Sequence, residues 1–303
     1  MSPASKPNKN AKAIQEVVVI SGKGGTGKTS VTAALAALGP KKVLADCDVD
    51  AADLHLVLAP DNIRTEDFIA GERAFINADA CVGCGLCLEH CRYGAVSAQF
   101  EIINENCEGC GVCAFVCPED AAVMLPRHCG VWHIAKTRFG SLVHARLGVA
   151  EENSGKLVTT VRQAARKLAE EQGASLILTD GPPGIGCPVI ASLGGADLAL
   201  AVAEPTTSAL HDLKRVHDLT KHFDIPLMVI INKSGINEEI TKTIGDYCKD
   251  NGVEMAGTLP YDNAFTQAQI RALSVVEYDP EGRGRDLLGL WNRIQARLDQ
   301  DNQ

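Results

Sequence analysis

Eight of the twelve cysteines of the chain are concentrated in one short stretch, and their spacing repeats. This stretch runs from Cys81 to Cys117, 37 residues in which about 1.5 cysteines would be expected by chance. The two copies are Cys81-x₂-Cys84-x₂-Cys87-x₃-Cys91 and Cys107-x₂-Cys110-x₂-Cys113-x₃-Cys117. Thiolates are strong ligands for soft metals, and a reduced compartment keeps cysteines free for that use. We therefore interpret the stretch as a metal-binding module.

Each copy resembles the cysteine run of the bacterial two-cluster ferredoxins, in which the fourth cysteine ligates the other cluster. The resemblance implies two [4Fe–4S] clusters. One would be held by Cys81, Cys84, Cys87 and Cys117, and the second by Cys107, Cys110, Cys113 and Cys91. Zinc is the alternative, because paired C-x₂-C motifs also bind that ion. The first copy departs from the ferredoxin pattern, since Arg92 rather than proline follows its last cysteine.

A second candidate site, the phosphate loop, lies near the start of the chain. The segment Gly22–Thr29 reads G-K-G-G-T-G-K-T and matches G-x-x-x-x-G-K-[ST], between an apolar run and a helical one. We expect Lys28 to reach the β- and γ-phosphates of a nucleotide and the Thr29 hydroxyl to bind Mg²⁺. The remaining predicted nucleotide contacts in this loop are Gly22, Gly24, Gly25, Thr26, Gly27 and Ser30.

The additional lysine, Lys23, makes this loop resemble the deviant Walker A loop of the MinD/ParA ATPases, a family that includes the nitrogenase iron protein and Mrp-type iron–sulfur carriers. The resemblance implies an ATP/ADP-binding protein that forms a homodimer on ATP, in which Lys23 reaches the nucleotide of the partner. Asp48 lies in a segment that resembles switch I, which implies that it orients the attacking water. Asp180 ends an apolar run as in Walker B and would hold Mg²⁺ through water.

Two later segments resemble the base-binding positions of the same family. Asn232 follows an apolar run and would contact the adenine edge, and Pro260 and Asp262 would lie near the base. Ordinary readings stay open for several of these residues. Asn232 and Lys233 are also typical of a simple turn, and Asp46, Asp48 and Asp50 could be solvated loop carboxylates.

Alternating apolar and helical segments predict an α/β fold with a doubly wound, mostly parallel sheet of the P-loop NTPase type. The expected strands are Val17–Ile20, Val43–Ala45, Leu176–Leu178, Leu198–Val202 and Leu227–Ile231. The expected helices are Ser30–Leu38, Leu157–Glu171, Ser208–His222, Glu238–Asn251 and Asp286–Leu298. We expect a disordered leader over residues 1–15, an ATPase domain over 16–74 and 127–303, and an inserted α+β ferredoxin-like domain over 75–126.

Charge and composition narrow the list of partners. The net charge of −9, with no basic patch outside the leader, argues against nucleic-acid binding. No apolar run is long enough to span a membrane and no secretory signal precedes the first strand, so we expect a cytoplasmic protein. The C-terminal stripe of Leu287, Leu288, Trp291, Ile294 and Leu298 predicts a closing core helix rather than a membrane helix.

The four other cysteines are Cys47, Cys129, Cys187 and Cys248. We expect Cys47 and Cys248 to be small buried hydrophobes. Cys187 lies seven residues after Asp180, where the nitrogenase iron protein has a cluster ligand, but the second cysteine such a cluster needs is missing from Val149–Asn153.

The resemblances together imply a Mg²⁺-dependent ATPase whose two clusters respond to nucleotide state as a redox-responsive switch. ATP-driven electron transfer to an unknown acceptor is the alternative, and cluster assembly is less favoured because no C-x₂-C pair lies outside the module.

Overall fold

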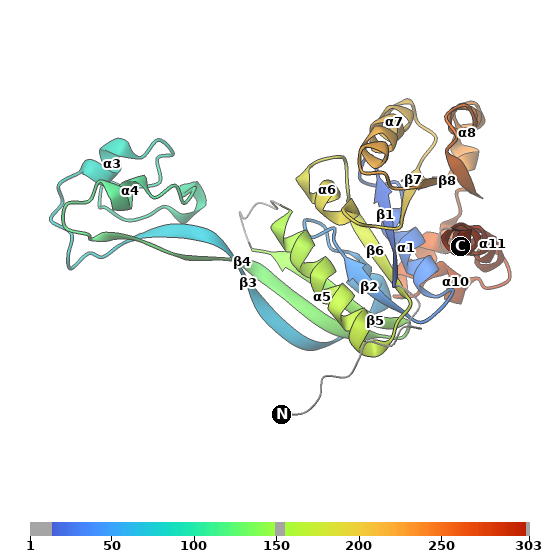
Figure 1. The fold of residues 1–303 in the computed structure, drawn as a ribbon, viewed down its shortest axis with the longest axis horizontal. Helices are drawn as coiled ribbons and strands as arrows, with labels where there is room; N and C mark the ends of the chain where they lie inside the picture. Colours follow the sequence, from blue (N-terminus) through green and yellow to red (C-terminus); the bar gives the residue numbers. More distant parts are fainter. Residues whose placement is uncertain (1–13, 149–154, 301–303) are drawn as a thin grey trace. The chain divides into compact units, whose positions relative to one another are not determined.

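The structure is a computed structural model that describes residues 14–148 and 155–300 (Figure 1). Of the predicted leader, only Ile14 and Gln15 are among the described residues. The segment Val149–Asn153, which the comparison with the nitrogenase iron protein concerned, lies outside them. The described residues form two compact units. The larger unit contains residues 14–65, 132–146 and 155–300, and the smaller unit contains residues 66–131 with 147–148.

The strands are joined in a sheet of order β3-β4-β5-β2-β6-β1-β7-β8-β9. Their bounds are β1 (Gln15–Ser21), β2 (Lys42–Asp46), β3 (Asp61–Ile76), β4 (Ala122–Thr137), β5 (Gly140–Leu147), β6 (Leu176–Pro183), β7 (Leu198–Ala203), β8 (Leu227–Asn232) and β9 (Glu254–Leu259). The six strand pairs from β5 to β9 are all parallel. The predicted parallel α/β sheet is therefore confirmed.

Helices cover both faces of this sheet, as expected for parallel strands with crossover connections. The helices of the larger unit are α1 (Lys28–Ala36), α2 (Leu54–Leu58), α5 (Lys156–Gln172), α6 (Cys187–Leu193), α7 (Thr207–His222), α8 (Glu238–Asp250), α9 (Asn263–Ile270), α10 (Val275–Tyr278) and α11 (Arg283–Gln300). A 3₁₀ turn, η2, spans Ser234–Ile236.

The central strand β1 explains how two cores arise on opposite faces. Val17 and Val19 pack with α1, α2 and α11, whereas Val18 and Ile20 pack with α6, α7 and α8. Successive strand residues point to opposite faces, so an uninterrupted apolar run is buried on both sides. This is why the short runs predicted as strands form the centre of the sheet.

Every strand and helix expected from the sequence is present, with shifted ends. The closing helix α11 is confirmed, but one member of its predicted stripe is wrong. Leu288 is exposed, and Leu290 is buried in its place beside Leu287 and Trp291, because the buried face follows the 3.6-residue period. Among the described residues, no helix is long and apolar enough to cross a membrane.

The smaller unit contains little regular structure beyond parts of β3 and β4. Its helices are α3 (Leu86–His90) and α4 (Val112–Phe115), and η1 (Asn104–Asn106) is a 3₁₀ turn. An antiparallel bridge joins Val96 to Ile102. Its buried core is small: Ala74, Cys87, Ala95, Val96, Cys107, Cys113 and Ala122. Three of these seven residues are cysteines, so apolar side chains alone give this unit little to pack.

Candidate functional site

The predicted nucleotide residues converge at the carboxyl ends of the parallel strands. The phosphate loop follows β1, Asp46 and Asp48 lie at the end of β2, Asp180 lies on β6 and Asn232 ends β8. Strand β1 lies between β6 and β7, so the connections diverge to both sides at this point of the sheet. In open α/β sheets such a point is where ligands bind.

The phosphate loop has the backbone shape that a cradle requires. Gly25 and Gly27 adopt left-handed φ angles of 80° and 89°, which only glycine adopts without strain. A Cβ on Gly27 would come within 2.3 Å of the Asn232 amide nitrogen, whereas one on Gly25 would meet nothing within 4 Å. Helix α1 begins at Lys28, directly after Gly27, so its N-terminal N–H groups face the same space.

Lys28 lies between Asp48, the predicted catalytic carboxylate, and Asp180, a predicted Mg²⁺ ligand. Its Nζ donates to Asp48 Oδ2 at 3.1 Å and to Asp180 Oδ1 at 3.0 Å. The Lys28 side chain is 6% exposed and that of Asp180 is fully buried. The structure thus brings the phosphate-loop lysine, the end of β2 and the end of β6 into one polar cluster.

The predicted Mg²⁺ ligands lie next to each other. The Thr29 hydroxyl donates to Asp180 Oδ2 at 2.8 Å, and the Thr32 hydroxyl lies 2.8 Å from Asp180 Oδ1. A hydroxyl beside a buried carboxylate is the oxygen donor set that Mg²⁺ prefers. Thr32 was not predicted, although it lies four residues after Lys28 on the same face of α1.

Burial and like charge shape the protonation of this cluster. Burial raises the pKa of Asp46 well above its ordinary value, and the nearby Asp180 raises it further. Burial also raises the pKa of Asp48, against the opposing effect of Lys28. For Lys28, burial alone would lower the pKa, but Asp180 and Asp48 raise it above its ordinary range. Asp46 and Asp48 are therefore buried and interact with the charges of Lys28 and Asp180, so they are not solvated loop carboxylates. Asp50, in contrast, is exposed.

The predicted base-binding residues follow β8 and β9. The Asn232 amide donates to the Thr26 carbonyl oxygen at 2.8 Å, so it braces the phosphate loop. Asn232 pairs in register with Leu259, which Pro260 follows directly and Asp262 follows three residues later. Asp262 caps α9 through the Ala264 N–H and forms an ion pair with Arg283. Ser30 accepts a hydrogen bond from Gln269.

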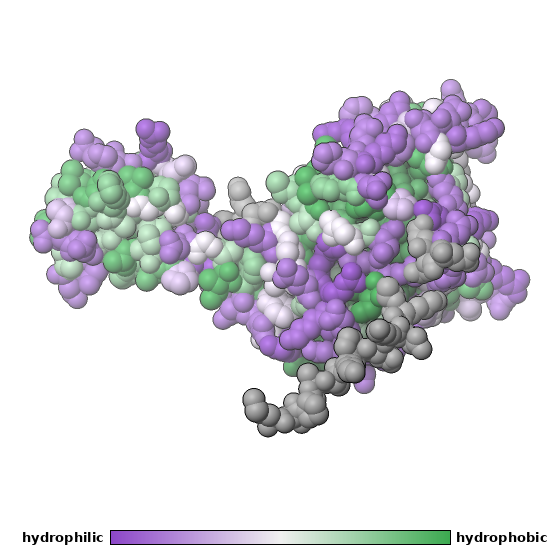
Figure 2. Space-filling model, in the orientation of Figure 1, coloured by the Kyte–Doolittle hydropathy of each residue, from purple (hydrophilic) through white to green (hydrophobic). Residues whose placement is uncertain are grey.

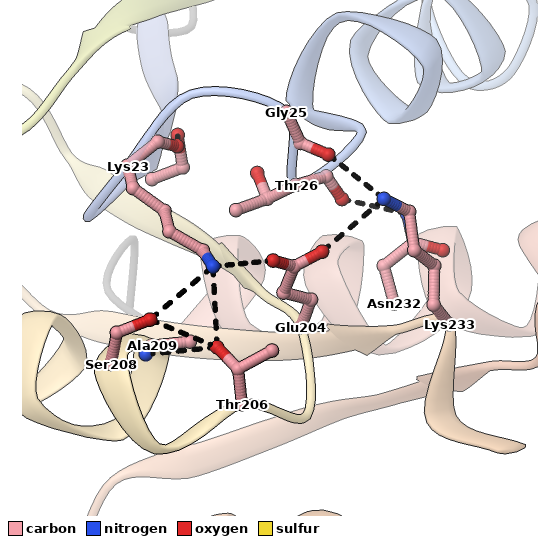
Figure 3. A network of polar contacts seen from close by, with 10 residues as sticks. Lys23, Gly25, Thr26, Glu204, Thr206, Ser208, Ala209, Asn232 and Lys233 are labelled. Atoms are coloured by element: carbon pink, nitrogen blue, oxygen red, sulfur yellow. Dashed lines mark hydrogen bonds and ion pairs between the residues drawn. The ribbon is translucent and has the colours of Figure 1, made fainter. Parts of the chain in front are cut away.

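A polar network that sequence reasoning missed surrounds Lys23 (Figure 3). Lys23 Nζ lies 2.6 Å from Glu204 Oε1, and the other oxygen of Glu204 lies 3.2 Å from Lys233 Nζ. Lys23 also donates to the hydroxyls of Thr206 and Ser208, each at 3.3 Å. The segment Glu204–Ser208 reads as ordinary helix capping, and the Thr206 hydroxyl does accept from the Ala209 N–H.

In the smaller unit, the eight spaced cysteines divide between two cavities. One cavity is lined by Cys81, Cys84, Cys87 and Cys117, together with apolar residues. The other is lined by Cys91, Cys107, Cys110 and Cys113. The fourth cysteine of each sequence copy thus lines the cavity of the other copy.

The backbone around the cavities is suited to thiolate ligands. Gly85 and Gly111 line the two cavities with φ angles of 82° and 76°, and a Cβ on either would meet nothing within 4 Å. The Ala95 N–H donates to Cys91 Sγ at 3.3 Å. The Ala122 N–H lowers the pKa of the Cys117 thiol. Burial raises the pKa of the Cys87 and Cys113 thiols.

The other cysteines have different surroundings. Cys47 and Cys248 are fully buried, as predicted, and Cys129 is also buried. Cys187 is exposed at the start of α6. Among the described residues, no group of three or more His, Cys, Asp or Glu side chains could hold a single metal ion.

Three histidines form a stacked cluster in the larger unit that the sequence did not indicate. The His144 ring centroid lies 4.8 Å from that of His133 and 5.5 Å from that of His55. His144 Nε2 lies 3.1 Å from Asn62 Oδ1, and His133 Nδ1 lies 2.8 Å from the Thr65 hydroxyl. The buried His55 Nδ1 has no partner among the described residues.

Comparison with known proteins places this site in a family. Residues 17–275 match the CobQ/CobB/MinD/ParA nucleotide binding domain family. The chain belongs to this family. Members of the MinD/ParA family are P-loop ATPases, so nucleotide binding at the phosphate loop is a property of the family.

Individual relatives agree with this assignment. An uncharacterized protein of Methanocaldococcus jannaschii is 37% identical over 227 residues, which are 74% of this chain and 80% of that protein. Pyrococcus horikoshii MinD complexed with Mg-ADP has a TM-score of 0.55 and 19% identity, with 93% of this chain and 96% of that chain covered. MinD from the Aquifex aeolicus MinC:MinD complex has a TM-score of 0.57 and 20% identity, covering 93% and 96%. The two solved structures show a shared fold.

Proposed function

We propose that this MinD/ParA-family protein binds and hydrolyses MgATP as a dimer, and that it carries two [4Fe–4S] clusters whose redox state is coupled to nucleotide state. The observation that carries the cluster assignment is the division of eight cysteines into two four-sulfur cavities. Each set of four thiolates combines three cysteines of one copy with the fourth cysteine of the other, which is the ligand exchange of a two-cluster ferredoxin. When bound, each cluster supplies reversible one-electron chemistry.

The small core of residues 66–131 supports the same assignment. Units of this size bury too little apolar surface to be very stable on their own and often gain stability from a bound metal. Here the central buried side chains are themselves cysteines, so a cluster in each cavity would complete the packing as well as the ligation.

The nucleotide site supports ATP hydrolysis through its own residues. Lys28 is poised to move from Asp48 and Asp180 to the phosphates, because a phosphate carries more negative charge than a carboxylate. That transfer leaves Asp48 free to orient water and leaves Asp180 and Thr29 free to hold Mg²⁺, directly or through water. Lys28→Ala should therefore abolish ATP turnover, and unchanged turnover would contradict the phosphate-loop assignment.

Anaerobic iron and sulfide analysis tests the cofactor directly. We expect about eight iron and eight sulfide per chain. Stoichiometric zinc with negligible sulfide would overturn the cluster proposal and support zinc. The switching role is then tested by measuring ATP turnover with the clusters reduced and oxidised, since a redox-responsive switch predicts two different rates without any added acceptor.

Electron transfer to another protein is the second candidate, and the surface of the smaller unit favours it. Each cavity includes one exposed cysteine, Cys84 or Cys110, so a cluster edge would be accessible. Hydrophobic side chains gather over α3 and α4 (Figure 2), and Phe115 on α4 is 91% exposed. Residues 66–131 contain ten of the 38 acidic residues but three of the 29 basic ones. This role predicts electron delivery to an acceptor with a basic surface only while ATP is hydrolysed.

A further inference from the structure

The Glu204 carboxylate lies between two lysines that both contact the phosphate loop (Figure 3). One oxygen is 2.6 Å from Lys23, a residue of the loop, and the other is 3.2 Å from Lys233. Lys233 in turn donates to the Gly25 carbonyl oxygen at 2.9 Å. Glu204 thus supports the phosphate loop at two points: directly at Lys23, and through Lys233 at Gly25.

The Lys23 ammonium contacts three oxygens, which together form the seat of this lysine, and not the Glu204 carboxylate alone. An ammonium has three N–H donors, and three oxygens surround this one: Glu204 Oε1 and the hydroxyls of Thr206 and Ser208. These oxygens come from the corner between β7 and α7, where Thr206 is held as the N-cap of α7. Lys23 therefore has its donors satisfied within its own chain.

The charges of this group remain paired at neutral pH. Burial alone would raise the pKa of Glu204, but hydrogen bonds from Lys23 and Lys233 lower it below its ordinary value. The exposed fractions of the Lys23 and Glu204 side chains are 32% and 16%. A partly exposed pair of this kind contributes little and is readily exchanged for a stronger anion.

We propose that Glu204 is a positioning residue for Lys23, holding it within its own chain in the absence of nucleotide and releasing it when a nucleotide-loaded second copy docks. The inference rests on the proposed ATP-dependent dimer, in which Lys23 serves the partner's nucleotide. On release, the Lys23 ammonium exchanges its contacts with one carboxylate and two neutral hydroxyls for contacts with phosphate oxygens. After release, Glu204 still pairs with Lys233, which donates to the Gly25 carbonyl oxygen. Docking of the second copy therefore affects the contact between Lys233 and the phosphate loop.

The resting contact is tested without nucleotide, by limited acylation of lysines with acetic anhydride and mass spectrometry. Glu204→Gln should raise acylation of Lys23 about two- to fivefold, the value of a partly exposed ion pair. The matched control is Asp246→Asn, which breaks the exposed Lys242–Asp246 pair of 2.6 Å and should affect Lys242 alone. Unchanged Lys23 acylation in Glu204→Gln would overturn the proposal.

Folding of the variant is checked within the same sample. Lys28 is buried, so its acylation should stay low in any folded variant. If Glu204→Gln exposes Lys28, Ser208→Ala replaces it, because this change removes one neutral oxygen and keeps both Glu204 and the Thr206 cap. Ser208→Ala should then raise Lys23 acylation about twofold, and no change would overturn the proposal.

Release is tested by sedimentation velocity with MgATP in an Asp48→Asn background that slows hydrolysis. Glu204→Gln should form dimers at about two- to fivefold lower protein concentration, because Lys23 no longer has to leave an ion pair. Dimer formation at the same or higher concentration would overturn the release step. If both proteins stay monomeric with ATP, the proposed dimer fails, and the acylation result still decides the resting contact separately.

Discussion

Acid should destabilise the larger unit through one buried histidine, His144. Its side chain is 7% exposed and lies against the rings of His133 and His55. Burial, together with the neighbouring His133 and His55, lowers the pKa of His144 from 6.5 to about 4. Burial and the charge of Arg146 also lower the pKa of His133. The folded protein therefore favours the neutral form of the His144 and His133 rings.

The sign of the effect follows from which state binds the proton. Between pH 6.5 and 4 the unfolded chain protonates this histidine and the folded chain does not, so stability falls as pH falls. One pKa unit corresponds to about 1.4 kcal/mol, which for this shift gives a loss of at most about 3 kcal/mol and about 2 kcal/mol on going from pH 7 to pH 5. No such loss is expected above pH 7.

Urea unfolding at pH 7 and pH 5 under anaerobic conditions measures this loss, using the far-UV circular dichroism of the helices. His144→Gln retains a donor for Asn62 but does not titrate, so its stability should fall by about 2 kcal/mol less than that of the wild type between the two pH values. His222→Gln, at an exposed histidine of the same unit, is the control and should behave as the wild type. A wild-type pH dependence in His144→Gln would refute the reasoning.

Three further outcomes follow from the two sites. Asp48→Asn should keep ATP binding, by equilibrium dialysis, but lower kcat about 10²- to 10⁴-fold through loss of the group that orients water; an unchanged kcat would exclude that role. Gly27→Ala should weaken ATP binding more than tenfold, because the new Cβ would collide with Asn232 at a left-handed φ; titration calorimetry showing wild-type affinity would contradict the cradle geometry. Cys81→Ala should remove about half of the iron and sulfide and leave the second cavity loaded, whereas loss of all iron would show that the two sites do not load independently.

Local patterns predicted the parts of the molecule that local chemistry determines. The phosphate loop was recognised because its glycines, Lys28 and Thr29 are consecutive, and the central strands because each is a continuous apolar run. Strand β3 was missed because most of its residues are exposed, and strand β4 because its buried and exposed residues do not alternate regularly. Such strands are paired by their backbones, which a side-chain pattern does not reveal.

Contacts between distant residues were beyond the reach of such patterns. Glu204 is 181 residues from Lys23, and the histidine cluster joins positions 55, 133 and 144. The partition of the cysteines was predictable because the repeat resembles that of the two-cluster ferredoxins, in which the fourth cysteine ligates the other cluster. A lone carboxylate after a strand, such as Glu204, carries no comparable resemblance.

The hairpin strands β3 and β4 have a consequence for how the chain could be rebuilt. The chain passes from the larger unit into the smaller one after Thr65 and returns to the larger one at Trp132. At that crossing the Thr65 hydroxyl lies 2.8 Å from His133 Nδ1, so the outgoing and incoming strands are neighbours. Two chain ends this close can be joined by a tight turn. Residues 66–131, which include all eight spaced cysteines, could therefore be excised at one place, leaving every residue of the nucleotide site on a continuous shorter chain.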